Sequence, residues 1–201
     1  MLSWAEGNVV VRFLRLWAVG LAVHFAAWTI AYFLLPEGAL RGVFSSSRLP
    51  LDESSWTAVA GRIVLYNVGV AAGLIAVANL FRVGRFPLGY VAVLAHWGLY
   101  GLFLGSDSFA YPRGGKLVPE VAGLLSRIGV WEITAYTLFA AATTGLFLYR
   151  QASWRNWSTA RVRSASDWRL SVGEWVAVAV SLLLIVAAGL REGVAIWGLG
   201  G

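Results

Sequence analysis

The stretch "GVWEITAYTLFAAATTGLFLY", residues 129–149, decides the class of fold, because it is apolar almost throughout and long enough to cross a bilayer. Its one charged residue, Glu132, lies one turn from the start. Similar stretches recur along the chain, and they are continuous rather than alternating, which favours helices over barrel strands. The sequence predicts an all-α, polytopic membrane helical bundle that forms a single domain over residues 1–201, with transmembrane helices at residues 13–35, 59–81, 87–104, 128–149 and 172–190.

Composition indicates the same class of protein. Apolar residues occupy 59% of the 201 positions, charged residues 13%, and the mean hydropathy is +0.70, which leaves too little polar surface for a soluble domain. We therefore expect a multi-pass protein of the inner (plasma) membrane. The chain contains no cysteine, which excludes disulfides, thiol catalysis and cysteine-ligated metals. Phosphate-binding glycine loops, His-Glu-x-x-His and Gly-x-Ser-x-Gly motifs are also missing, so we expect no enzyme activity and no metal site.

The distribution of basic residues predicts the orientation in the membrane. One side of the predicted bundle has three acids and nine arginines, namely Arg12, Arg15, Arg82, Arg85, Arg150, Arg155, Arg161, Arg163 and Arg169. The other side has seven basic and seven acidic residues, so the whole net charge of +6 lies on the first side. This predicts a cytoplasmic N-terminus and an outer C-terminus. On the outer side, residues 119–127 are predicted to form a short interfacial helix.

The fourth connection, "RQASWRNWSTARVRSASDWRL", interleaves arginine with Trp154, Trp157 and Trp168. Tryptophan can stack on nucleic-acid bases, but beside a membrane arginine pairs with anionic headgroups while tryptophan settles in the interface. We expect this connection to lie at the lipid surface, where a cytoplasmic partner could also dock, and we expect no nucleic-acid partner.

Several polar residues fall inside the predicted spans. Glu132 and Arg62 occur at about the same depth near the outer interface, and a charge at such a site is costly unless it is paired. We expect these two residues to pair, with Arg191 and Glu192 extending the group. The pair could be a structural clamp, or it could couple a conformational change or the transport of an ion or small molecule. Asn67, two turns below Arg62, is expected to form an interhelical hydrogen bond.

Both histidines, His24 and His96, also fall in membrane spans. Gly20 and Ala92 precede them by four residues, and small residues at that spacing leave room for a flat macrocycle beside an axial histidine. A tetrapyrrole, either haem or a bacteriochlorophyll-type pigment, is therefore one possible cofactor. A histidine that hydrogen-bonds to a neighbouring helix is the commoner arrangement, so our leading expectation is that no cofactor is bound.

The order of these features resembles the stage II sporulation protein M family of bacterial and archaeal membrane proteins. The segment "LYNVGVAAG" supplies Asn67, residues 129–149 supply Gly129 and Glu132, and "VAAGLREGVAIW" supplies Glu192. The family has a Pro-His-Gly-x-x-Glu segment, and here Arg127 and Ile128 stand in place of its proline and histidine. The resemblance implies a scaffold for membrane complexes rather than an enzyme, with these residues in structural or coupling roles.

Three hypotheses about function follow from the sequence. The first is a non-catalytic scaffold or transport-associated subunit that contacts the lipid bilayer and other membrane-protein subunits. The second is a tetrapyrrole-binding subunit of a photosynthetic or respiratory complex, which would use His24 and His96. The third is a transporter of ions or small molecules, which would use Glu132 and Arg62.

Overall fold

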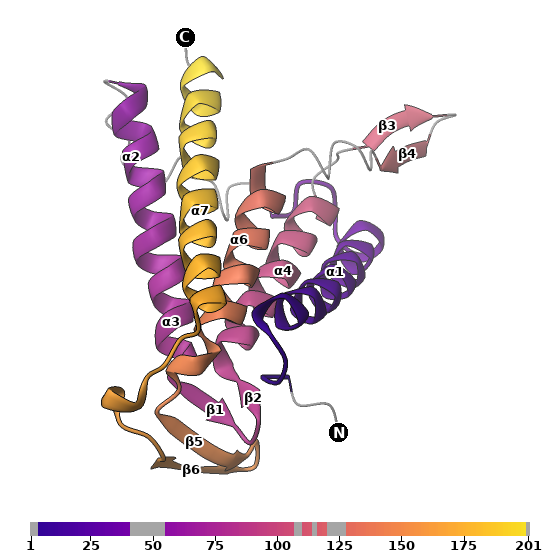
Figure 1. The fold of residues 1–201 in the computed structure, drawn as a ribbon. Coiled ribbons are helices and arrows are strands. Elements are labelled where there is room, and N and C mark those ends of the chain that lie inside the picture. Colours follow the sequence, from indigo (N-terminus) through magenta and orange to yellow (C-terminus); the bar gives the residue numbers. More distant parts are fainter. Residues whose placement is uncertain (1–3, 41–54, 107–109, 114–115, 120–127, 200–201) are drawn as a thin grey trace.

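The computed structural model describes residues 4–40, 55–106, 110–113, 116–119 and 128–199, and most of these residues are helical. Figure 1 shows a bundle of helices with a small sheet at one end. Four helices are long and apolar enough to cross a membrane: Val9–Leu34, Trp56–Asn79, Leu88–Ser106 and Val172–Val194. The prediction of a mostly helical fold is confirmed, and these four helices, which coincide with four of the five predicted spans, are consistent with a membrane protein.

The long helices begin and end where the local sequence indicates. Helix α1 (Val9–Leu34) is capped by Asn8, whose side chain accepts a hydrogen bond from the Val11 amide at 3.0 Å. The second long helix comprises α2 (Trp56–Tyr66), a π-helical turn η2 (Asn67–Ala72) and α3 (Gly73–Asn79). Its N-cap is Ser55. Helix α4 (Leu88–Ser106) and helix α7 (Val172–Leu199) complete the set of long helices.

The predicted fourth span is shorter than expected. Helix α6 (Ile128–Ala142) has 15 residues, and the chain then tightens into a 3₁₀ turn, η3 (Thr143–Leu146). The prediction of a helix to residue 149 is wrong because the backbone of the following residues pairs elsewhere. The amides of Leu148 and Tyr149 both donate to the Leu80 carbonyl, at 2.8 and 2.9 Å, which directs the chain into a sheet.

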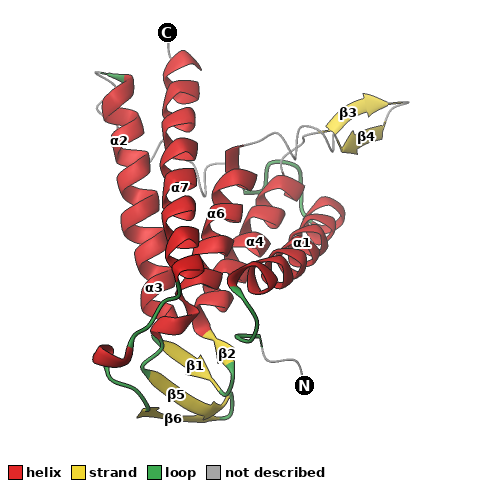
Figure 2. Cartoon of the chain, in the orientation of Figure 1, coloured by secondary structure: helices red, strands yellow, loops and turns green. Residues whose placement is uncertain are grey.

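This sheet was not predicted, and it corrects the all-α assignment. It contains β1 (Phe81–Val83), β2 (Phe86–Pro87), β5 (Tyr149–Ser153) and β6 (Asn156–Arg161), in the order β2-β1-β5-β6. Strands β1 and β5 run parallel, with Phe81 paired to the distant Tyr149, and the other pairs are antiparallel. Figure 2 shows the four strands at the end of the bundle opposite the C-terminus. The predicted second and fourth connections therefore form one structure.

A separate two-stranded hairpin lies at the other end of the bundle. It consists of β3 (Ala110–Arg113) and β4 (Lys116–Pro119). The predicted interfacial helix over residues 119–127 is not seen at Pro119, which belongs to β4. Its remaining residues, 120–127, lie outside the described part of the chain.

Helix α6 forms the centre of the bundle. It packs against α1, α4 and α7, and Ala135, Ala140 and Ala141 are fully buried. Large side chains complete the core around it, chiefly Leu16, Tyr90, Trp97, Tyr136 and Ile185. Helix α7 packs against both α6 and α2. A short helix suffices at this position because its neighbours, rather than lipid, cover much of its surface.

Candidate functional site

The sheet concentrates positive charge at one end of the molecule. Residues 81–87 and 149–170 contain one acid, Asp167, and seven arginines: Arg82, Arg85, Arg150, Arg155, Arg161, Arg163 and Arg169. We call the four strands, together with the β1–β2 and β5–β6 turns, the basic sheet. Arg85, Arg150, Arg155 and Arg161 are exposed, so the sheet presents a cationic surface on a hydrogen-bonded and therefore ordered scaffold.

Arg82 and Arg163 of this region make internal contacts, and the exposed Arg150 lies beside them. Arg82 and Arg150 occupy paired positions on β1 and β5, and the guanidinium carbons of Arg82, Arg163 and Arg150 lie 3.8, 4.8 and 5.8 Å from the centre of the Phe147 ring. This arrangement is cation–π geometry. Burial, followed by the charge of Arg150, lowers the pKa of Arg82 to about 10. Arg82 therefore stays protonated at neutral pH, and it donates to the Thr144 carbonyl at 2.7 Å.

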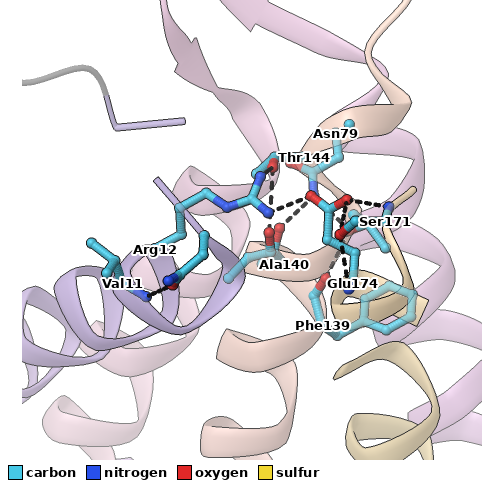
Figure 3. A network of polar contacts seen from close by, with 12 residues as sticks. Val11, Arg12, Asn79, Phe139, Ala140, Thr144, Ser171 and Glu174 are labelled. Atoms are coloured by element: carbon cyan, nitrogen blue, oxygen red, sulfur yellow. Dashed lines mark hydrogen bonds and ion pairs between the residues drawn. The ribbon is translucent and has the colours of Figure 1, made fainter. Parts of the chain in front are cut away.

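A buried polar network joins this end of the bundle together, as Figure 3 shows. Arg12 of α1 forms an ion pair with Glu174 of α7 and donates a hydrogen bond to the Thr144 hydroxyl. The side chains of Arg12 and Glu174 are only 7% and 12% exposed. Glu174 also accepts hydrogen bonds from the amide and hydroxyl of Ser171, at 2.8 and 3.0 Å. We call these four residues the anchor network.

Asn79 forms a second link between the helices beside the anchor network. Its Nδ2 donates to the Ala140 carbonyl at 2.9 Å and to the Thr143 hydroxyl at 2.7 Å. Because Asn79 ends α3 and only Leu80 separates it from β1, these bonds tie the start of the basic sheet to helix α6. The sheet is thus fixed to the bundle through α1, α3, α6 and α7.

Sequence reasoning missed the anchor network, although part of it has a sequence signal. Ser171 and Glu174 have the spacing of a capping box, Ser-x-x-Glu, which indicates a helix start. Arg12 gives no such signal, since an arginine before an apolar run usually reaches water or lipid headgroups. Only the packing of α1 near α7 reveals its partner.

Ion pairs join Arg12 to Glu174 and Arg85 to Glu6, and the pair of Glu132 and Arg62 stays a prediction. Glu132 accepts a hydrogen bond from the hydroxyl of Tyr136, one turn further along α6. Arg62 lies on α2 with an exposed side chain. Helix α7 packs against both α2 and α6. The transport hypothesis, which would use Glu132 and Arg62, stays a prediction.

Two residues of the group predicted around Glu132 and Arg62 lie near each other. Glu192 of α7 is close enough to Glu132 for their charges to interact. Arg191, the neighbouring residue, has an exposed side chain. The structure thus brings the two acids of the group near each other.

The two histidines face different neighbours. His24 of α1 is buried, its Nδ1 lies 3.4 Å from the Trp97 carbonyl oxygen, and its ring meets those of Trp97 and Tyr100. His96 of α4 meets the ring of Tyr136 on α6, edge to face at 5.5 Å. The space beside Gly20 is filled by the Trp97 indole, because a Cβ at Gly20 would lie 2.5 Å from Trp97 Nε1.

The absence of a bound pigment stays a prediction. We expect the protein purified from its native membrane to show only the ultraviolet absorption of its aromatic residues. A Soret or bacteriochlorophyll band that disappears in His24→Phe or His96→Phe would contradict this expectation.

Small residues mark the tightest helix contacts. A Cβ at Gly101 or Gly105 would collide with the carbonyl oxygens of His24 and Trp28 on α1. A second pair, Gly189 and Gly193 on α7, packs against α2, and a Cβ at Gly193 would lie 2.5 Å from that of Ala60. This second pair was missed, although its Gly-x-x-x-Gly spacing is a recognised signal for close helix packing.

The remaining residues of the family resemblance occupy structural positions. Asn67 is buried at the start of the π-helical turn, and its Nδ2 has no hydrogen-bond partner among the described residues. Gly129 leaves space for the hydroxyl of Tyr100.

Compared with known proteins, the chain matches no family model, no curated protein and no solved structure. Membership of the stage II sporulation protein M family therefore stays a prediction.

Proposed function

We propose that this protein is a non-catalytic, multi-pass subunit of a complex in the inner (plasma) membrane, and that its basic sheet holds an acidic partner protein in the cytoplasm. One observation carries the proposal: a cationic surface is built on an ordered sheet and fixed to the membrane helices by buried polar contacts. A surface that only touched headgroups would not require the anchor network. The resemblance to sporulation protein M, whose members are scaffolds, agrees with this role.

The proposal requires the basic sheet to face the cytoplasm. The N-terminal segment lies at the same end as the sheet, since Trp4 packs edge-on against Phe86 with ring centres 5.9 Å apart and Glu6 pairs with Arg85 at 3.5 Å. The excess of arginine at this end favours the cytoplasmic side by the positive-inside rule. The C-terminal end of α7 would then face outward.

We expect cysteine labelling to confirm this orientation, because the natural chain contains no cysteine. Ser158→Cys, on β6, should be protected from a membrane-impermeant maleimide in intact cells and should react after permeabilisation. Ala39→Cys, after α1, should react in intact cells. Both native residues are exposed, so a difference in labelling reports the side of the membrane rather than burial. The reverse pattern would place the basic sheet outside the cell and reject the proposed partner.

We also expect charge reversal on the basic sheet to remove a stoichiometric partner. Arg155→Glu/Arg161→Glu changes two exposed arginines, so the fold should persist while attraction to an acidic surface becomes repulsion. The measurement is quantitative mass spectrometry of complexes solubilised from native membranes, together with their size on native gels. The matched control is Arg191→Glu, an exposed arginine towards the other end of α7. An unchanged set of partners in the double variant, or equal losses in the control, would refute the proposal.

A further inference from the structure

An open groove lies where the basic sheet meets the helices. It has a volume of about 430 Å³ and runs between the end of α3, the end of α6 and the start of α7. Its floor is apolar, with Phe139, Leu146 and Val178 among the lining side chains, and the half-exposed Trp175 stands beside them. We call it the inner groove. In a membrane this position lies in the leaflet on the same side as the basic sheet.

Two nitrogen-bearing side chains line this apolar groove. The indole Nε1 of Trp168 is buried and has no hydrogen-bond partner among the described residues. A buried donor without a partner is costly, so a ligand that supplies an acceptor would be favoured. The guanidinium of Arg169 donates from Nη1 to the carbonyls of Ser166 and Trp168, at 3.1 and 2.9 Å. The Nη2 and Nε atoms of Arg169 donate no hydrogen bond to the described residues, so they are available to an anion.

An acyl chain with a phosphate at one end matches this combination. We propose that the inner groove binds one anionic phospholipid, with its chain along Phe139, Leu146 and Val178 and its phosphate at Arg169 and Trp168 Nε1. Charge complementarity selects this occupant, because Arg163 also lies nearby, with hydrogen bonds to the carbonyls of Gly145 and Asp167 at 3.5 and 3.0 Å. Basic pockets between transmembrane helices are typical sites for anionic headgroups. The proposal goes beyond the partner protein and does not depend on it.

Native mass spectrometry of the purified protein in detergent tests the proposal directly. With equal amounts of phosphatidylglycerol and phosphatidylcholine added, we expect one phosphatidylglycerol to be retained preferentially. Arg169→Gln should lower its retention about fivefold, since one arginine near a membrane surface contributes about 1 kcal/mol to anionic lipid binding. Arg155→Gln, which removes an exposed arginine of the basic sheet outside the groove, should leave retention unchanged.

A steric variant provides a second measurement. Val178→Trp should fill the inner groove and abolish the preferential retention of phosphatidylglycerol. The melting temperature of this variant shows whether it still folds. If the variant does not fold, the result for Arg169→Gln decides alone. Equal retention of both lipids, or equal losses in Arg169→Gln and Arg155→Gln, would overturn the proposal by showing non-specific binding. Displacement of the lipid by millimolar inorganic phosphate would overturn it too, because the site would then recognise phosphate without the chain.

Discussion

Replacing Glu174 by glutamine should lower the free energy of unfolding by about 3 kcal/mol, the lower end of the cost of breaking a buried ion pair. The reason is that Arg12 stays buried after its charged partner is removed. Its side chain is 7% exposed, its Nε already has no hydrogen-bond partner among the described residues, and its remaining contact is to the neutral hydroxyl of Thr144. The measurement is unfolding by denaturant in mixed micelles, repeated in lipid bilayers.

A double-mutant cycle separates the ion pair from other effects of the substitution. Arg12→Met alone should also destabilise, because it leaves the Glu174 carboxylate without a cation. The double variant Arg12→Met/Glu174→Gln should recover much of the loss, since no uncompensated charge stays buried. The matched control is Glu6→Gln, which removes the exposed ion pair with Arg85 and should cost at most about 1 kcal/mol. Losses that simply add in the double variant would show that Arg12 and Glu174 act independently.

The sequence was sufficient to predict the features that depend on local pattern. Runs of apolar residues located the long helices, and α7 begins at the expected residue, Val172. Signals of the same local kind are the side chain of Ser55, which caps α2, and the small residues of α4, which lie at its close contact with α1. In each case the determining interactions lie within one helix or on one helix face.

The features that were missed depend on contacts between distant segments. The parallel pairing of Arg82 with Arg150 joins strands far apart in the chain, and a strand of three residues has no recognisable period. The end of α6 depends on the Leu80 carbonyl, and the partner of Arg12 lies 162 residues away. The hydrogen bond from the Tyr136 hydroxyl to Glu132 on the same helix was also missed, because a buried charge points first to a cation as its partner.

Replacing Gly101 by alanine should destabilise the protein by about 2 kcal/mol, within the usual range for overpacking a tight contact. The added Cβ would collide with the His24 carbonyl oxygen and would lie 3.1 Å from the Ala27 Cβ. A backbone carbonyl cannot rotate away as a flexible side chain can, so α1 must move from α4 along their extensive contact. The same unfolding measurement applies, and disulfide trapping between cysteines placed on α1 and α4 reports their separation.

Gly98, one turn earlier on α4, provides the control for this prediction. A Cβ there would meet only Val23 Cγ1, at an ordinary distance of 3.5 Å. Alanine also favours a helix over glycine by up to about 1 kcal/mol, so Gly98→Ala should be neutral or stabilising. Opposite signs for the same substitution one turn apart would show that the tight α1–α4 contact includes Gly101 but not Gly98. Equal effects at both positions would mean that α4 can shift to accommodate a methyl group, and that the contact between α1 and α4 is looser than the structure shows.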